Sequence, residues 1–260
     1  MKTTLLHRTK QGLLALMVPV AICSCTANGQ FDTETAIGLG ANAMQAATLS
    51  EDQVAQAASL SAREQDRKSQ VAPANSPYTQ RLTRLTSGLA NAAGLSLNYK
   101  VYMTKELNAF AMADGTVRVY SGLMDVMPDD QILAVLGHEI GHVKLKHSYK
   151  QLKETILTDT AFKAVGSMGG NLGALTEGQL GQLGQAAVNA HFSQKDELAA
   201  DAFSVRTLNA MGKDPHSMRD AIQTLKAKMG DGGGFLSSHP SNDAHLANID
   251  KTIAKLGSAR

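Results

Sequence analysis

The segment His138-Glu139-Ile140-Gly141-His142 constrains this chain more than any other feature of its sequence. Residues four apart share one face of an α-helix, so both imidazoles of an H-E-x-x-H segment can reach one metal ion. The neighbouring Glu139 can then act as a general base on a water molecule held by that ion. We therefore expect a helix here, and a fold that brings a third ligand to the same point, because a catalytic zinc ion has three protein ligands and one open position.

The third ligand must come from elsewhere in the chain. Leu145 and Ser148 stand where a metzincin-type extension would place glycine and histidine, and His147 is predicted to be a solvated residue at the end of the helix. Glu197 is the better candidate, and Asp201, one helical turn later, could accept a hydrogen bond from a ligand histidine and fix its tautomer. Alternatively, these acidic residues only favour the start of an ordinary helix.

The N-terminus predicts export. Three basic residues precede an apolar run at 12–22 that is too short to span a bilayer, which is typical of a signal peptide. The segment Ile22-Cys23-Ser24-Cys25 resembles a bacterial lipobox, which implies a lipoprotein signal peptide over 1–24 and lipidation of Cys25. The alternative is a secreted protein with two incidental cysteines. Because no cysteine follows Cys25, the mature chain cannot form an internal disulfide bond.

Composition excludes some partners. Lys2, Arg8 and Lys10 lie in the predicted leader, and the remaining 22 basic residues face 23 acidic ones, so a basic face for nucleic acid is not expected. Hydrophobic residues make up 43% of the chain but aromatic residues only 4%, which favours a helical protein. No apolar run of 18 residues follows Ile22, so no transmembrane helix is expected.

Hydrophobic periodicity predicts an N-terminal helical lead-in at 25–76, with a helix at 41–60, and a peptidase domain at 77–260. The domain begins with a helix at 78–93 and three strands at 97–103, 108–112 and 116–120, the last two joined by an Asp114-Gly115 hairpin. Further helices are predicted at 129–147, 150–166, 176–191, 194–211, 215–229 and 243–256. The Gly-rich stretch 166–184 is either a loose hairpin or a poor helix. The expected fold class is α+β, with a small sheet and a mostly helical remainder.

The order H-E-x-x-H and then E-x-x-A-D at 197–201 resembles the gluzincin family of the HtpX membrane protease and the CaaX prenyl endopeptidase. The segments 108–111, 117–123 and Ser238-His239-Pro240 also resemble that family. The lipobox and short lead-in are similar to its periplasmic lipoprotein members, of the LoiP and YcaL type. The resemblance implies a zincin-like fold with an edge strand, and one zinc ion per chain bound by His138, His142 and Glu197.

The resemblance also implies roles around the zinc site. An extended substrate would pair with the strand made of Thr116, Val117, Arg118, Val119 and Tyr120, with Asn108 as a positioning residue. His239 would stabilise the oxyanion of the tetrahedral intermediate, or else serve as a structural histidine beside Pro240. The remaining histidines His191, His216 and His245 are predicted to be surface or capping residues.

The expected function is a zinc endopeptidase that cleaves unfolded or misassembled proteins of the cell envelope in a Gram-negative bacterium. A lipid anchor would hold it at the periplasmic face of the outer membrane, since Thr26 rather than aspartate follows Cys25. Its partners would be protein or peptide substrates and the membrane. Two alternatives stay open: a catalytically silent, zinc-bearing chaperone-like lipoprotein, and an amidase that acts on cell-wall peptides.

Overall fold

The computed structural model describes residues 49–89, 94–159, 162, 175–230, 234–240 and 243–257. The predicted signal peptide 1–24, Cys25 and residues 166–174 of the Gly-rich stretch lie outside these residues. The described elements are α2 (Glu51–Lys68), α3 (Pro77–Thr86), β1 (Asn98–Tyr102), β2 (Ala109–Ala111), β3 (Thr116–Tyr120), α5 (Ser121–Val126), α6 (Asp129–Lys144), α7 (His147–Thr158), α9 (Glu177–Val188), α10 (Gln194–Ala210), α11 (Ser217–Met229), α12 (Phe235–Ser238) and α13 (Asp243–Gly257).

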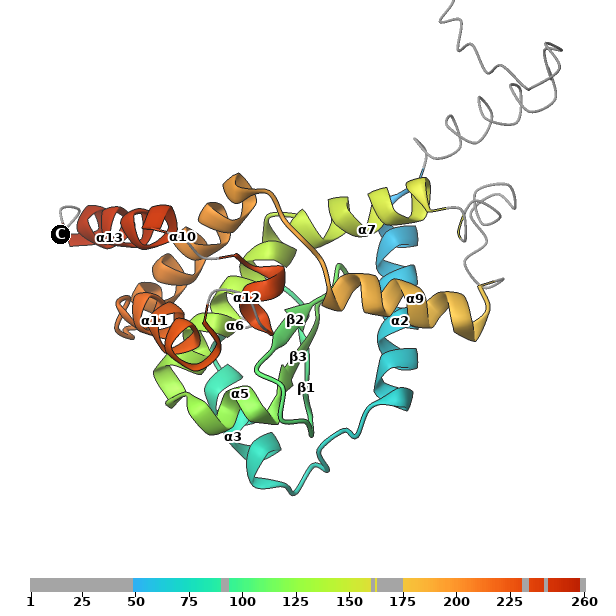
Figure 1. Cartoon of the computed structure of the whole chain (residues 1–260), viewed down its shortest axis with the longest axis horizontal. Coiled ribbons are helices and arrows are strands. Elements are labelled where there is room, and N and C mark those ends of the chain that lie inside the picture. Colours follow the sequence, from blue (N-terminus) through green and yellow to red (C-terminus); the bar gives the residue numbers. More distant parts are fainter. Residues whose placement is uncertain are drawn as a thin grey trace, which may run out of the picture. The chain divides into compact units, whose positions relative to one another are not determined.

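The three strands form one mixed sheet in the order β1-β3-β2 (Figure 1). β3 runs parallel to β1 and antiparallel to β2. The predicted hairpin between β2 and β3 is confirmed: Gly115 has a φ of +87°, a conformation that favours glycine. Asp114 supports the turn by accepting hydrogen bonds from the backbone N–H and the hydroxyl of Thr116.

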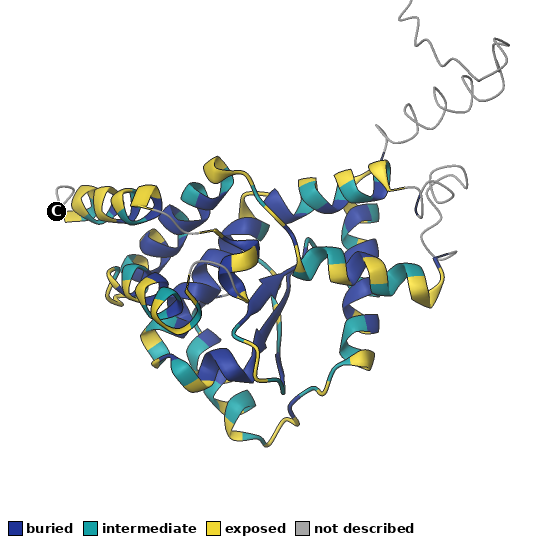
Figure 2. Cartoon of the chain, in the orientation of Figure 1, coloured by how far each residue is buried: buried dark blue, intermediate teal, exposed yellow. Residues whose placement is uncertain are grey.

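Helices cover both faces of the sheet. Successive side chains along a strand point to opposite sides, so each strand contributes to two separate cores. Val101, Val117 and Val119 belong to a core shared with α3, α5, α6 and α10–α13. Tyr102 and Tyr120 belong to a second core beneath α2, α7 and α9. Figure 2 shows the strands and α6 as the most deeply buried elements. The sheet is thus the middle of three layers, and α6 is buried nearly all round.

A charged cluster fastens α2 to the sheet. Asp66 of α2 accepts two hydrogen bonds from the buried guanidinium of Arg118, at 2.8 and 2.9 Å. It also accepts from Lys100 Nζ at 2.7 Å and from the Tyr102 hydroxyl at 2.8 Å. Part of the predicted lead-in therefore packs in the same compact unit as the strands and the later helices.

Side-chain caps mark the starts of four helices. The hydroxyls of Ser50, Ser76, Thr176 and Ser193 accept backbone N–H groups in the first turns of α2, α3, α9 and α10. The α+β class is confirmed, and α9, α10, α11 and α13 lie close to the predicted helical ranges. The helix predicted at 129–147 is confirmed as α6, but it ends at Lys144, and the left-handed conformation of Lys146 (φ 63°) separates it from α7.

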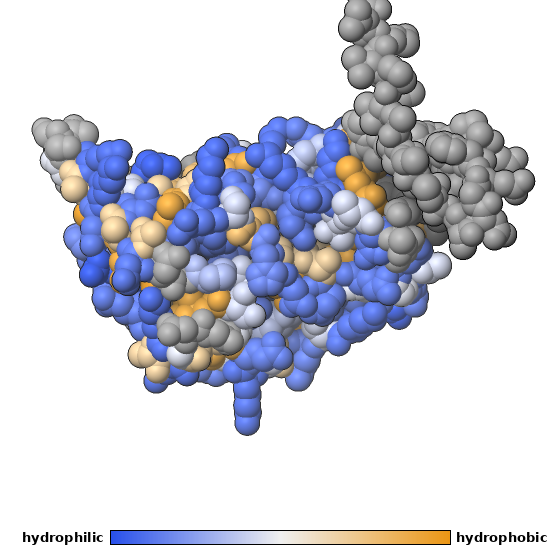
Figure 3. All heavy atoms as spheres, turned by 45° about the horizontal axis from the view of Figure 1, so that its top comes forward, coloured by the Kyte–Doolittle hydropathy of each residue, from blue (hydrophilic) through white to orange (hydrophobic). Residues whose placement is uncertain are grey.

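Within the described ranges, no helix is both long and apolar enough to cross a membrane. The face shown in Figure 3 is mostly hydrophilic, and its hydrophobic residues gather in small separate groups.

Candidate metal centre

Helix α6 presents His138 and His142 on one face, as their spacing predicts. Both side chains are buried, and their Nε2 atoms lie 3.1 Å apart. Helix α10 brings Glu197 to the same point: its Oε2 lies 3.3 Å from His138 Nε2, and its Oε1 lies 3.6 Å from His142 Nε2. Two helices that are far apart in sequence thus place two imidazoles and one carboxylate around one position.

Small residues allow α6 and α10 to approach this closely. A Cβ atom added at Gly141 would lie 3.1 Å from Ala200 Cα, and one added at Gly137 would lie 2.8 Å from Ser204 Oγ. The backbones of the two helices are therefore nearly in contact beside the site. A larger residue at either glycine would push Glu197 away from the two histidines.

Asp201 lies where it was predicted, one turn after Glu197. Its Oδ1 is 2.9 Å from His138 Nδ1, so it accepts the proton on that nitrogen and leaves Nε2 free to bind a metal ion. Its Oδ2 lies 2.7 Å from His245 Nδ1. The prediction that His245 is a surface or capping residue is wrong, because His245 is only 2% exposed and supports Asp201 from α13.

His239 joins the same group of atoms from the residue after α12. Its Nδ1 lies 3.0 Å from Glu197 Oε1 and 3.4 Å from His138 Nε2. The ligand atoms of His138, His142, Glu197 and His239 all lie within 4.8 Å of one another, and all four residues are buried. These four residues could hold a metal ion, so His239 is a possible fourth ligand as well as the predicted oxyanion donor.

Glu139 faces the group with one carboxylate oxygen unpaired. It is 2% exposed, and its Oε1 has no hydrogen-bond partner among the described residues. The nearest basic group is His239 Nε2, at 3.4 Å. Burial raises the pKa of Glu139, which suits a group that must both accept and release a proton near neutral pH.

The electrostatics of the group favour one bound positive charge. Burial lowers the pKa of His138, but hydrogen bonds to Asp201 and Glu197 outweigh it and raise this pKa well above the ordinary value. Burial likewise raises the pKa of Glu197, yet hydrogen bonds from His138 and His239 bring it far below the ordinary value. The two buried carboxylates thus favour a positive charge at this point, which either a proton on His138 or a bound metal ion would supply.

Two aromatic rings frame the histidines, and sequence analysis did not single them out. Phe192 stacks on His142 with 3.9 Å between the ring centroids, and Phe235 stacks on His239 at 4.5 Å. Phe192 comes from the connection between α9 and α10, and Phe235 begins α12. They limit the orientations that the two imidazoles can take.

The prediction that His147 is solvated is also wrong. His147 begins α7, is 6% exposed, and has its Nδ1 3.1 Å from His142 Nδ1. The break at Lys146 turns the chain back, so that His147 faces the side of His142 away from the ligand group. His191 and His216 are exposed, as predicted.

The predicted substrate strand is not an edge strand. β3 is the central strand and pairs with a neighbour on both sides, so its backbone cannot accept a further strand. All its side chains are buried: Thr116, Val117, Arg118, Val119 and Tyr120. Arg118 is held by Asp66 and serves the fold. This prediction is therefore wrong, and β2 is the edge strand next to α6.

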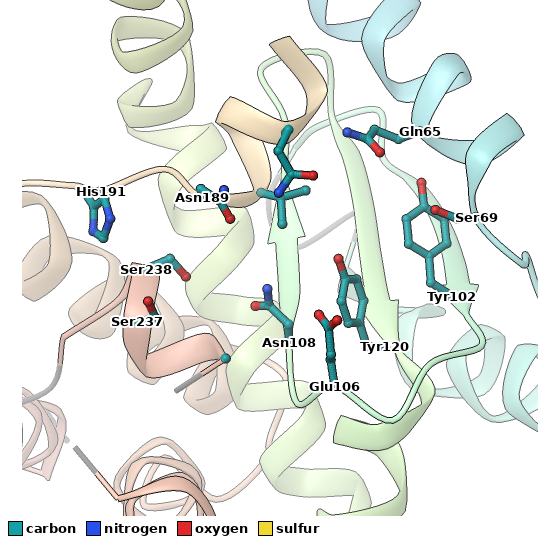
Figure 4. A pocket seen from close by; sticks show the side chains of 13 residues that line it. Gln65, Ser69, Tyr102, Glu106, Asn108, Tyr120, Asn189, His191, Ser237 and Ser238 are labelled. Atoms are coloured by element: carbon teal, nitrogen blue, oxygen red, sulfur yellow. The ribbon is translucent and has the colours of Figure 1, made fainter. Parts of the chain in front are cut away.

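A cavity of about 600 Å³ lies over the sheet beside β2 (Figure 4). Asn108, at the start of β2, and Tyr120 point into it from the sheet. Its other walls come from α2, α9, the α9–α10 connection and α12, which contribute Gln65, Ser69, Gln185, Val188, Asn189, His191, Ser237 and Ser238. The lining is mostly polar, and Ser238 is directly followed by His239.

The comparisons with known proteins agree with this geometry. The sequence model of Peptidase family M48 matches residues 77–253 of this chain. The chain is 40% identical to Metalloprotease LoiP of Escherichia coli (strain K12) over 91% of this chain and 94% of that protein. It is 39% identical to Metalloprotease YcaL of the same strain, over 93% of this chain and 96% of that protein.

A more distant relative is the beta-barrel assembly-enhancing protease of Yersinia pestis, which is 28% identical over 65% of this chain and 38% of that protein. The expected resemblance to proteases of the LoiP and YcaL type is confirmed. The chain belongs to peptidase family M48 and is a metalloprotease.

Proposed function

We propose that this metalloprotease is a zinc-dependent endopeptidase of the bacterial cell envelope, acting on unfolded or misassembled envelope proteins. The observation that carries the catalytic part is the convergence of His138, His142 and Glu197 on one point, with the unpartnered Oε1 of Glu139 beside it. Three such ligands and a nearby carboxylate are the parts that a hydrolytic metal site needs.

The donor set fits zinc. Two nitrogen atoms bound to one tetrahedral zinc ion at 2.0–2.1 Å are about 3.3 Å apart. The Nε2 atoms of His138 and His142 are 3.1 Å apart, and the Glu197 oxygens lie at 3.3 and 3.6 Å from them. Imidazole and carboxylate ligands, with Asp201 behind one imidazole, support zinc over cations that prefer oxygen ligands alone.

The chemistry then follows from the positions of the side chains. Zinc, when bound, lowers the pKa of a coordinated water molecule towards 7. Glu139, whose pKa is raised by burial, takes the proton from the attacking water and later delivers it to the leaving amine. Removal of such a positioned acid–base group slows a reaction by about 10²- to 10⁴-fold.

The edge of β2 is our candidate for binding the substrate main chain. The Asn108 carbonyl and the Met112 N–H bond to β3, so the alternate residues Ala109 and Ala111 direct backbone groups away from β3. The Ala109 N–H now donates to Asn108 Oδ1 and the Ala111 carbonyl accepts from Ser148 Oγ, so a substrate strand would replace these two hydrogen bonds. Ala111 is also close to the catalytic base, since its backbone donates a hydrogen bond that acts on the pKa of Glu139. An extended peptide paired with β2 would therefore bring its main chain next to Glu139.

The adjacent cavity supports a substrate longer than a dipeptide. It is large enough for several side chains, and its polar lining suits main-chain and polar groups. A peptide must be extended to lie along β2 and this cavity, and folded proteins seldom offer such a segment. This is the physical reason for preferring unfolded or misassembled substrates.

The envelope assignment has separate support. The predicted signal peptide 1–24 and the lipidation of Cys25 would place the protein at a membrane surface, outside the cytoplasm. One relative is named for enhancing beta-barrel assembly, which suggests outer-membrane proteins as a substrate class. Replacing Cys25 with serine should move the protein from the membrane fraction to the soluble fraction of the periplasm, and an unchanged distribution would contradict the lipid anchor.

The substrate class can be tested with the purified protein and three substrates: an unfolded protein, the same protein in its folded form, and purified peptidoglycan. We expect cleavage of the unfolded protein alone, its loss on chelation, and its return with zinc. Cleavage of peptidoglycan would favour the cell-wall amidase. Zinc binding without cleavage of any substrate would favour the silent chaperone-like lipoprotein.

A further inference from the structure

The second nitrogen of His142 has a partner that the catalytic scheme does not use. Nε2 of His142 faces the ligand group, while its Nδ1 lies 3.1 Å from Nδ1 of His147. On the far side of that ring, Nε2 of His147 lies 3.2 Å from Oδ1 of Asp196. No other described residue accepts a hydrogen bond from Nδ1 of His142.

The direction of these hydrogen bonds follows from the need for a free Nε2 on His142. A neutral imidazole carries one proton, so an Nε2 that binds a metal ion leaves the proton on Nδ1. That N–H can donate only to an unprotonated Nδ1 of His147. The proton of His147 then lies on its Nε2, where the Asp196 carboxylate accepts it. Every donor therefore has an acceptor in the series His142, His147 and Asp196.

The fold holds the members of this series in place. The left-handed turn at Lys146 brings His147 back against His142, and His147 is 6% exposed. Asp196 precedes Glu197 in the first turn of α10, and its Oδ2 accepts a hydrogen bond from Ser193 Oγ at 2.7 Å. The first turn of α10 therefore supplies the Glu197 carboxylate to the ligand group and the Asp196 carboxylate to His147.

We propose that His147 and Asp196 are positioning residues that hold His142 with its proton on Nδ1 and its Nε2 free for the metal ion. They act on His142 as Asp201 acts on His138. This inference rests on the proposed zinc site. Partners of this kind typically change metal affinity by about 10- to 100-fold when they are removed.

The test compares zinc affinity among full-length variants, measured by competition with a chromogenic chelator. His147→Leu removes the acceptor and should weaken zinc binding by about 10- to 100-fold. His147→Gln keeps a carbonyl to accept from His142 and an amide to donate to Asp196, so it should restore most of the affinity. Asp196→Ala should weaken binding in the same direction.

A matched control comes from the exposed pair at the start of α11. His216 Nδ1 lies 2.8 Å from Asp214 Oδ1, and both side chains are more than half exposed. His216→Leu makes the same chemical change far from the ligand group and should leave zinc affinity unchanged. The visible absorption spectrum of each variant loaded with cobalt should change in His147→Leu and not in His216→Leu, because it reports ligand geometry.

Thermal unfolding without metal separates positioning from packing. A positioning role predicts that His147→Leu has a near-normal melting temperature without metal but gains less stability from zinc than the wild type. The inference is overturned if His147→Leu and wild type bind zinc equally, or if His147→Gln loses as much affinity as His147→Leu. A wild type that binds no zinc would overturn the proposed function as well, so the two failures are distinguishable.

Discussion

Gly141 of α6 lies against the backbone of Ala200 in α10, so close that a Cβ atom at Gly141 would come within 3.1 Å of Ala200 Cα. This contact sets the distance between the helix that carries His138 and His142 and the helix that carries Glu197. The candidate metal centre thus depends on the absence of a side chain at Gly141 as well as on the side chains that could bind the ion.

Gly141→Ala should therefore damage both stability and metal binding. We expect a loss of about 1–3 kcal/mol in the free energy of unfolding, because overpacking a tight contact forces backbone shifts. Chemical denaturation measures the loss, and zinc affinity should fall with it. Gly257→Ala is the matched control, since a Cβ atom there meets nothing within 4 Å. Equal stability of Gly141→Ala and the wild type would contradict this view of the contact.

Removing the support behind His138 should weaken zinc binding without removing a ligand. Asp201→Ala leaves His138 free to change tautomer and orientation, so zinc affinity should fall by about 10- to 100-fold. His245→Phe should have a smaller effect in the same direction, because Asp201 itself remains. Chelator competition measures both changes, and an unaltered affinity in Asp201→Ala would mean that the 2.9 Å contact does not orient His138.

Helix positions explain why the convergence of the candidate ligands could be predicted from sequence. His138 and His142 are four apart, as are Glu197 and Asp201, so one helical rule places each pair on one face. The pairing of the two helices then follows from the ligand count of zinc. No knowledge of the intervening chain is needed for either step.

Two supporting histidines could not be predicted in this way, because their partners depend on the path of the chain. His245 meets Asp201 only through the packing of α13 on α10. His147 would point away from His142 if α6 continued, and the break falls at Lys146, a residue type with no preference for a left-handed conformation. The one feature of the sequence that could have indicated this contact is the position of His147, five residues after His142.

The order of the strands in the sheet also could not be predicted from the sequence pattern. Alternating and β-branched residues predict strands but not which strand lies between the others. Thr116–Tyr120 was predicted as an edge, yet all five of its side chains are buried and both neighbours are paired. A charged residue such as Arg118 favours an exposed strand, but here its charge is buried and paired with Asp66, which lies on a helix more than 50 residues earlier.

The cluster around Asp66 predicts a specific acid sensitivity. Burial raises the pKa of Asp66, but hydrogen bonds from Arg118, Lys100 and Tyr102 outweigh burial and lower the pKa below its ordinary value. The cluster's contribution to stability is therefore fully present above about pH 4, the pKa of an unfolded aspartate, and is lost as the pH falls through the folded pKa.

Asp66→Asn should remove that contribution at neutral pH. We expect a loss of about 3 kcal/mol, at the lower end of the range for unpairing a buried charge, because Arg118 keeps hydrogen bonds to two backbone carbonyls. Between pH 5 and pH 2 the stability of the variant should fall less steeply than that of the wild type. Parallel pH profiles in urea denaturation would contradict the role of Asp66.

His239 can be tested as a fourth donor against its predicted role at the oxyanion. Three protein ligands suffice for a catalytic zinc ion, so a fourth ligand from His239 would occupy the position that the water molecule needs. We expect His239→Ala to keep one zinc per chain and to cleave an unfolded substrate faster than the wild type. His216→Ala is the control and should cleave at the rate of the wild type. A fall of about 10²- to 10³-fold in kcat would instead support the oxyanion role.

The most direct test of the proposed catalytic centre is the comparison of Glu139→Gln with the wild type, with zinc content and cleavage of an unfolded protein measured on the same samples. Glutamine keeps the shape of Glu139 but cannot take a proton, so the variant should bind one zinc per chain and lose at least 10²-fold in turnover. Full activity in a zinc-loaded Glu139→Gln variant would contradict the assignment of Glu139 as the base. Loss of zinc together with activity would show that Glu139 supports the metal site and not the proton transfer.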